Sequence, residues 1–153
     1  MRIFVDSDAC PVKEEIMKIA QAEKVMAYFV SSTRNFFVVK EGAVYYQWVL
    51  ADQGKEALEL YIANQINAGD IVITHDYGLA SMVLGKKGYV MTPRGRRIDQ
   101  DNIEFLLFRK HVHSKVFRTF CKLNGSKSLH EEDRLLFSLK LLELINCSQK
   151  EGY

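Results

Sequence analysis

The sequence predicts an α/β domain built around a mainly parallel β-sheet. Short apolar stretches that suit buried strands alternate along the chain with longer segments whose apolar residues recur at helical spacing. Parallel strands need crossover connections, and helices usually supply them, so this alternation favours parallel pairing. Two of the apolar stretches are followed directly by aspartates, as is typical where strands carry polar residues to a ligand site.

The first elements follow from the local pattern. Residues 2–6, RIFVD, carry an apolar run and predict a short buried strand. Pro11 then opens a helix, because its missing N–H costs nothing in a first helical turn. A second strand is predicted over 25–31. Residues 35–50 follow as strand material that turns at Glu41–Gly42.

The alternation continues through the middle of the chain. A helix is predicted from about 55 to 67, where apolar residues recur at helical spacing. The run DIVIT, residues 70–74, predicts another buried strand, and a helix follows around 79–84. Residues 89–92 predict a further strand, after which PRGRR, residues 93–97, makes a basic turn.

The C-terminal part of the chain is predicted to be helical. One helix is expected over 102–113 and another over 130–147, because apolar residues recur there at helical spacing. Between them KLNGSKS, residues 122–128, has the composition of a linker. The final helix is therefore expected to extend the main domain.

Length and composition fit a single folded domain. The chain has 153 residues, of which 48% are apolar, so it can bury a sizeable core. We expect one domain over 1–153, with its core over about 1–118 and a C-terminal helical extension over about 119–153. The net charge of +2 does not by itself indicate a nucleic-acid partner, so only local charge can do so.

The cysteines indicate a reducing compartment. Cys10, Cys121 and Cys147 are widely spaced and give neither a disulfide framework nor a zinc-binding pattern. No secretory signal is visible, and no apolar run reaches the roughly 20 residues that a membrane-spanning helix needs. We therefore expect a cytoplasmic protein without a membrane partner, and the sequence leaves the oligomeric state open.

Five carboxylates are predicted to meet at one edge of the sheet, because ligands of an open parallel sheet bind at the carboxyl ends of its strands. They are Asp6 and Asp8 after the first strand, Asp76 after the strand over 70–74, and Glu56 and Glu59 in the first turns of the helix that begins near residue 55. The two glutamates lie three residues apart and share one helix face.

Such a cluster needs a cation to offset its repulsion, and Mg²⁺ or Mn²⁺ prefers oxygen ligands. We expect Asp6 and Asp76 to hold the ion. Asp8, Glu56 and Glu59 would orient waters or a second ion, and Glu59 completes the predicted ligand set. A site of this kind can orient and deprotonate water for attack on a phosphodiester.

Each acid also has an ordinary structural explanation. Asp8 can cap the helix at Pro11, and the two glutamates can complement the helix dipole. Asp76 can be a turn residue before Gly78. We interpret Gly69–Asp70 as a structural turn, Cys10 as a packing residue beside the site, and His75 as structural.

Basic residues are concentrated between 86 and 118, where nine Lys and Arg stand against three acids. Arg94 and Arg96 follow a strand end, which places Arg94 on the same rim as the acids. A basic rim beside an acidic cluster suits a phosphate backbone, so both arginines are predicted to bind substrate. Thr74 is predicted to tune Asp76 through a hydrogen bond.

The motifs VDSDACPVK, GDIVITHDYGLA, TPRGRRIDQDNI and EEDRLLF resemble those of the YaiI/YqxD-like family of uncharacterised bacterial proteins. The likeness runs in order through nearly the whole chain. It implies a PIN-like fold, the three-layer α/β fold of metal-dependent ribonucleases, and it implies activity only by analogy.

The family motifs fall on the predicted site residues. Asp-x-Asp-Ala-Cys-Pro falls on 6–11, Thr-x-Asp on 74–76, Pro-Arg-Gly on 93–95 and Asp-Arg-x-x-Phe on 133–137. The usual Gly-x-Asp-x-Ala-Asp reads Gly-Lys-Glu-Ala-Leu-Glu over 54–59. Both acids of this motif are therefore one methylene longer here. The segment SSTRNFF also differs from the family's usual Asn-containing strand end.

The sequence is compatible with three functions. The favoured one is a Mg²⁺- or Mn²⁺-dependent nuclease that acts on single-stranded RNA. The second is a PIN-like module that binds RNA or a protein through its basic rim without catalysis. The third is a phosphatase of the haloacid-dehalogenase type, to which IFVDSD is superficially similar.

Overall fold

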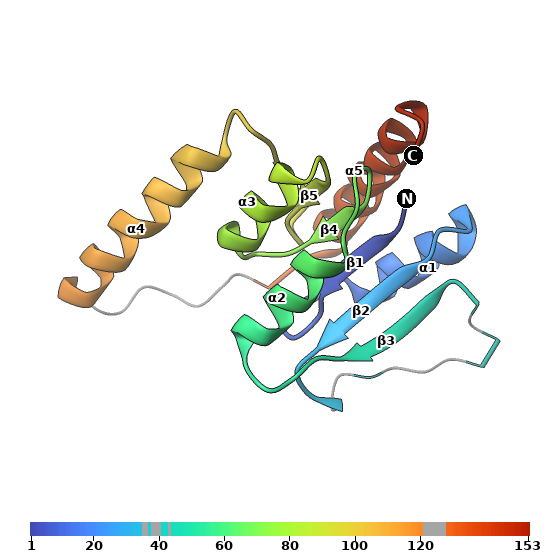
Figure 1. Ribbon diagram of the computed structural model, residues 1–153, viewed down its shortest axis with the longest axis horizontal. Coiled ribbons are helices and arrows are strands. Elements are labelled where there is room, and N and C mark those ends of the chain that lie inside the picture. The colour runs from blue at the N-terminus through green and yellow to red at the C-terminus, as the bar shows by residue number, and fades with distance from the viewer. Residues whose placement is uncertain (35–36, 38–40, 43, 121–127) are drawn as a thin grey trace.

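A six-stranded sheet forms the centre of the computed structural model, which describes residues 1–34, 37, 41–42, 44–120 and 128–153 (Figure 1). The strands are β1 (Ile3–Asp6), β2 (Ala27–Ser31), β3 (Tyr46–Leu50), β4 (Ile71–Ile73), β5 (Tyr89–Met91) and β6 (Arg97–Ile98). The helices are α1 (Lys13–Glu23), α2 (Lys55–Gln65), α3 (Tyr77–Gly85), α4 (Ile103–Phe120) and α5 (Glu131–Lys150).

The sheet order is β3-β2-β1-β4-β5-β6, and every neighbouring pair is parallel except β5 and β6. The predicted α/β class with a mainly parallel sheet is therefore confirmed. The order in which strands are added to the sheet changes direction between β1 and β4. From β1 the chain adds β2 and β3 on one side, and it then returns to add β4 and β5 on the other side of β1. Ligands of open sheets usually bind at such a switch point.

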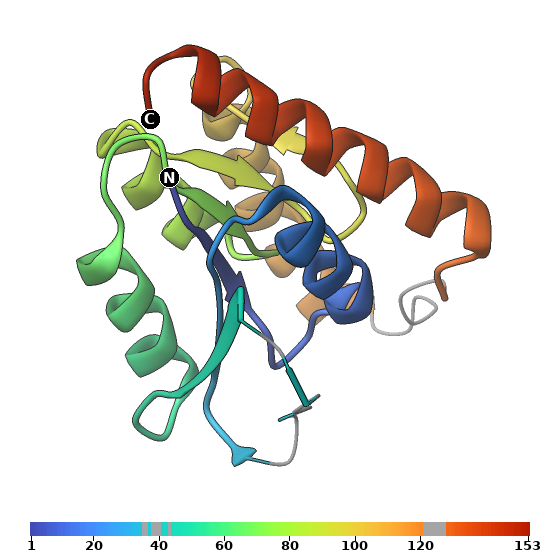
Figure 2. The ribbon, with the colours of Figure 1, turned by 90° about the vertical axis from the view of Figure 1, so that its right-hand side faces the viewer.

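Helices cover both faces of the sheet and make three layers. Successive side chains of a strand point to opposite faces, so Ile3 and Val5 pack on one side of β1 and Phe4 on the other. α1 and α5 cover the face of Ile3 and Val5, and α2, α3 and α4 cover the face of Phe4. Figure 2 shows α1 and α5 on one side of the sheet and α2 on the other. Burial on both faces explains why the central strands are continuously apolar.

The structure extends one predicted helix and adds one strand. α4 continues to Phe120, beyond the predicted end at 113. Residues 93–97 form the predicted turn, but Arg97 and Ile98 also pair with β5 as an antiparallel strand. Gly95 makes this hairpin possible with a φ of +79°, and its N–H donates to the Thr92 carbonyl at 2.8 Å. A two-residue strand leaves no periodic signal in the sequence.

Two predictions fall partly outside the described residues. Of the strand material predicted over 35–50, β3 is confirmed and Glu41–Gly42 forms the expected turn, whereas 35–36, 38–40 and 43 are not described. The predicted linker over 122–128 lies outside the described residues except for Ser128. Within the described ranges, no helix is both long and apolar enough to cross a membrane.

Asp70 has the structural role that the sequence indicates. Its buried carboxylate accepts hydrogen bonds from the Arg2 backbone N–H at 2.8 Å, the Arg2 guanidinium at 2.7 Å and the Asn67 N–H at 2.9 Å. These bonds satisfy a buried charge and hold the start of β1 beside the start of β4. Asp70 therefore lies at the edge opposite the carboxyl ends of the strands.

Candidate functional site

One cleft opens at the carboxyl edge of the sheet and has a volume of about 490 Å³. Its lining comes from the ends of β1, β2 and β4 and from α2 and α4: Asp6, Asp8, Ala9, Ser32, Leu58, His75, Asp76 and Lys110. Three of the five predicted acids therefore meet here. The position follows from topology, because β1 and β4 are parallel neighbours and end side by side.

Thr74 connects the two aspartates that follow these strands. Its buried hydroxyl donates to Asp6 Oδ2 at 3.1 Å and accepts from the Asp76 backbone N–H at 3.0 Å. The Thr74 hydroxyl thus contacts only the main chain of Asp76 in this pair of bonds, and it donates its hydrogen bond to the carboxylate of Asp6 and not to that of Asp76. The bridge fixes the spacing between the two strand ends on which the acids stand.

Asp76 is both a cleft residue and a helix cap. Its Oδ1 accepts from the Leu79 N–H at 2.9 Å as the N-cap of α3. Its Oδ2 lies 3.6 Å from Nζ of Lys110, which reaches the cleft from α4. The side chain of Asp76 is 9% exposed and that of Lys110 is 53% exposed. The structural explanation and the functional one therefore apply to the same residue.

Asp8 is held against the end of β2. It accepts hydrogen bonds from the Ser31 hydroxyl at 2.7 Å and from the Ser32 N–H at 3.0 Å. Partial burial raises the pKa of Asp8, but the hydrogen bonds of Ser32 and Ser31 and the charge of Lys13 outweigh it and lower this pKa below its ordinary value. Asp8 does not cap α1, whose N-cap residue is Val12. It instead anchors the loop after β1 to the neighbouring strand.

Replacing Asp8 by alanine is expected to lower the free energy of unfolding by about 1 to 2 kcal/mol at pH 7, because the serine donors lose a charged acceptor. A lowered folded-state pKa contributes stability above the ordinary carboxyl value of 3.8, and this contribution is lost as pH falls through the folded pKa. The difference from wild type should therefore shrink below about pH 4 in urea titrations. D101A removes an exposed acid as the control, and an equal loss in both variants would contradict the anchoring role.

Glu56 and Glu59 are not part of the cleft lining. Glu56 is exposed in the first turn of α2, where it complements the helix dipole, and Glu59 is half-buried one turn further on. Leu58, between them, is the α2 residue that lines the cleft and is buried. The structure therefore brings Asp6, Asp8 and Asp76 together and leaves these two glutamates outside the lining.

The cations of the cleft differ in part from those predicted. His75 lines the cleft. Desolvation and the charge of Arg94 lower the pKa of this histidine, so its imidazole is neutral at pH 7. The predicted Arg94 thus lies near the rim. Arg96 is exposed, and it bonds through its backbone N–H to the Thr92 hydroxyl at 3.1 Å. Sequence reasoning missed Lys110, because nothing local indicates that α4 brings it to Asp76.

The oxygen donors of the cleft limit the kind of ion that it suits. Within the described ranges, no group of three or more His, Cys, Asp or Glu side chains is arranged to hold a metal ion. Asp6 and Asp76 remain as two carboxylates from adjacent strands that open on one cleft. One or two carboxylates with several waters is the usual protein ligation of Mg²⁺, so this pair fits a hard divalent cation that keeps much of its hydration.

Cys10 packs beside the cleft as expected. Its thiol is buried, and burial raises its pKa to about 12. The thiolate is the nucleophilic form, so this side chain is inert at neutral pH.

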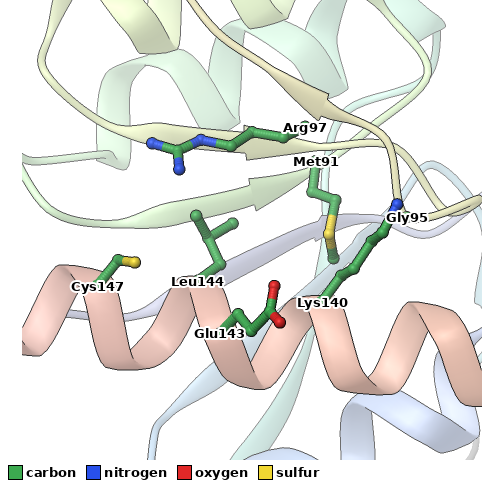
Figure 3. A pocket seen from close by; sticks show the side chains of 7 residues that line it. All are labelled: Met91, Gly95, Arg97, Lys140, Glu143, Leu144 and Cys147. Atoms are coloured by element: carbon green, nitrogen blue, oxygen red, sulfur yellow. The ribbon is translucent and has the colours of Figure 1, made fainter.

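A second pocket of about 200 Å³ lies between the β5–β6 hairpin and α5 (Figure 3). Arg97 enters it from β6, and Lys140, Glu143 and Cys147 enter it from α5. All four are exposed, and the pocket contains a single carboxylate. It therefore lacks the paired acids of the cleft between β1 and β4.

Comparison with known proteins matches residues 4–147 to the model of a family described as "Uncharacterized BCR, YaiI/YqxD family". A UPF0178 protein of Bacillus velezensis is 42% identical over 98% of this chain and 87% of its own length. UPF0178 proteins of Bacillus pumilus and Clostridium tetani are 39% and 36% identical, over 99% and 98% of this chain and 89% and 100% of their own lengths. No solved structure matches the chain. The predicted resemblance is confirmed, and none of these names states an activity.

Proposed function

Because the chain belongs to the YaiI/YqxD family, whose matched relatives bear names without an activity, we propose its function from the cleft itself: a Mg²⁺- or Mn²⁺-dependent nuclease that cleaves single-stranded RNA. One observation carries the proposal. Asp6 and Asp76 stand at the ends of adjacent parallel strands, are connected through Thr74, and open with Lys110 on the same cleft.

In this proposal two of the acids would bind the metal ion, and their neighbours would hold the cleft in shape. Asp6 and Asp76 would hold the divalent cation, which when bound supplies a Lewis acid for a phosphoryl oxygen and acidifies a water. Thr74 keeps the two strand ends at a constant spacing. Asp8 holds Ser32 at the cleft wall, and the serine hydroxyl adds a polar contact there. Preorganised groups of this kind need no rearrangement during the reaction.

The charge around the cleft supports a phosphate substrate. Lys110 and Arg94 bring positive charge to the cleft and its rim, and neutral His75 can donate a hydrogen bond without adding repulsion or attraction. A single strand is flexible and its bases can unstack, so it can enter such a cleft where a rigid duplex cannot. The cleft volume of about 490 Å³ accommodates one nucleotide unit and its flanking phosphates.

A catalytically silent RNA-binding module is the second candidate. The observation that favours it is the position of Glu56 and Glu59 outside the cleft lining, which leaves three of the five expected carboxylates there, and one of them, Asp8, is already bonded to Ser31 and Ser32.

The phosphatase hypothesis has less support. It takes its nucleophile and its acid/base from the Asp-x-Asp pair Asp6 and Asp8, but Asp8 accepts several hydrogen bonds at the end of β2. The aspartate of the later Gly-Asp, Asp70, is buried against Arg2 at the opposite edge of the sheet.

The test is the cleavage of a labelled pool of single-stranded RNA by purified protein in Mn²⁺ or in chelator. The nuclease proposal expects cutting that depends on Mn²⁺ and stops in chelator. A folded protein that binds Mn²⁺, cuts none of the pool and retains RNA equally well in chelator would replace it with the binding-module function. A small phosphate ester in the same assay tests the phosphatase.

A further inference from the structure

Lys110 occupies an unusual place for a surface lysine. It comes from α4, whose Ile103 and Leu106 pack into the core on the same face of the sheet as α3. Its Nζ reaches to 3.6 Å of Oδ2 of Asp76, a carboxylate that is nearly buried. The exposed Arg109 beside it does not line the cleft. Among the described residues, Lys110 is therefore the single cationic side chain that lines the cleft, and it forms an ion pair with Asp76, a predicted metal ligand.

We infer that Lys110 competes with the divalent cation for Asp76 and binds the substrate phosphate once the metal ion has displaced it. The inference rests on the proposed function and deepens it, because it assigns a substrate-binding residue to the same cleft. Without metal, the ammonium neutralises Asp76 and limits its repulsion with Asp6. Metal and ammonium are both cations, so their repulsion makes each weaken the binding of the other at Oδ2.

The energetics of the pair make the exchange easy. An ion pair in which the lysine is half-exposed is weak, and it is further weakened by salt. A divalent ion with twice the charge interacts more strongly with the same carboxylate. Binding coupled in this way is reciprocal, so Lys110 must weaken metal binding by the factor with which metal weakens the ion pair.

The displaced side chain remains useful at the cleft. Lysine carries a compact ammonium with three donors on a flexible four-carbon stem, so Nζ can leave Asp76 and stay within the cleft. A phosphate held near Asp76 would offer it an anionic partner. Lys110 would then bind substrate through charge and geometry, which predicts an effect on KM larger than that on kcat.

The experiment compares wild type with K110Q, K110R and the matched control R109Q, which removes the neighbouring positive charge outside the cleft. Glutamine and arginine are good helix formers, so α4 is retained. Isothermal titration with Mn²⁺ alone measures metal affinity, and single-stranded RNA cleavage measures KM and kcat. Circular dichroism and urea unfolding establish that each variant is folded.

The expected result is an Mn²⁺ affinity roughly two- to tenfold tighter in K110Q and unchanged in R109Q, with K110R close to wild type. KM for RNA should rise about tenfold or more in K110Q. Equal or weaker Mn²⁺ binding in K110Q, or an equal change in R109Q, would overturn the inference and leave the nuclease standing. Tighter Mn²⁺ binding in K110Q with no cleavage by any variant would refute the nuclease and the phosphate role together.

Discussion

Replacing Asp76 by asparagine is expected to abolish Mn²⁺ binding in the cleft and to lower RNA cleavage at least about 100-fold, which corresponds to about 2.7 kcal/mol of transition-state stabilisation. Asparagine keeps an oxygen that can accept from the Leu79 N–H, so α3 retains its cap. The substitution removes the negative charge that both the metal ion and Lys110 require. The stability should therefore change much less than the activity.

Three variants separate these roles in one experiment. D76A removes the charge and the cap together and should lower the free energy of unfolding by about 1 kcal/mol more than D76N. D99N changes an aspartate that accepts from the Asn102 N–H near the start of α4, and it does not line the cleft. It should leave Mn²⁺ titrations and cleavage unchanged. Cleavage by D76N at the wild-type rate would remove Asp76 from the reaction.

Replacing Phe137 by alanine is expected to lower the free energy of unfolding by about 3 to 5 kcal/mol, a large part of what a domain of this size has. Phe137 is fully buried on α5 and belongs to the core cluster that also contains Ile16 of α1 and Val5 of β1. The β5–β6 hairpin also approaches here, since a Cβ at Gly95 would lie 3.4 Å from Cα of Phe137. Removing the ring leaves a cavity. The surrounding helix, sheet and hairpin are held by their own contacts and cannot move in to close it.

The same substitution tests whether the C-terminal helix belongs to the folding unit. Arg134 donates to the Pro11 carbonyl at 2.8 Å, and Ser148 donates to the Gly69 carbonyl at 2.7 Å, so both ends of α5 are tied to the rest of the fold. L139A on the exposed face of α5 is the control and should change stability by less than about 0.5 kcal/mol. Urea unfolding measures both variants. A loss below about 1 kcal/mol in F137A would mean that α5 is a separable extension.

The local pattern of the sequence predicted most of the fold, because strands and helices differ in hydrophobic period and chain topology constrains where strands end. The buried runs at 2–6 and 70–74 became parallel neighbours, and the aspartates after them reached one edge. This result required only that both strands be central and parallel. The resemblance to the YaiI/YqxD family was equally a property of the sequence.

The composition of the cleft was decided by tertiary packing. Leu58 turned inward and the neighbouring glutamates did not enter the lining, because the apolar side chain is the one that gains from burial in that face. Asp8 accepts hydrogen bonds from Ser31, the last residue of β2, and from Ser32, which follows it; these serines are 23 and 24 residues away in sequence.

Lys110 lies beside Asp76 because α4 packs against the rest of the fold in the way described above. The local sequence around Lys110 does not indicate this contact. A short sequence window specifies backbone period and strand ends. The direction of each side chain, and its partner across the cleft, follows only when distant elements pack and their polar groups must be satisfied.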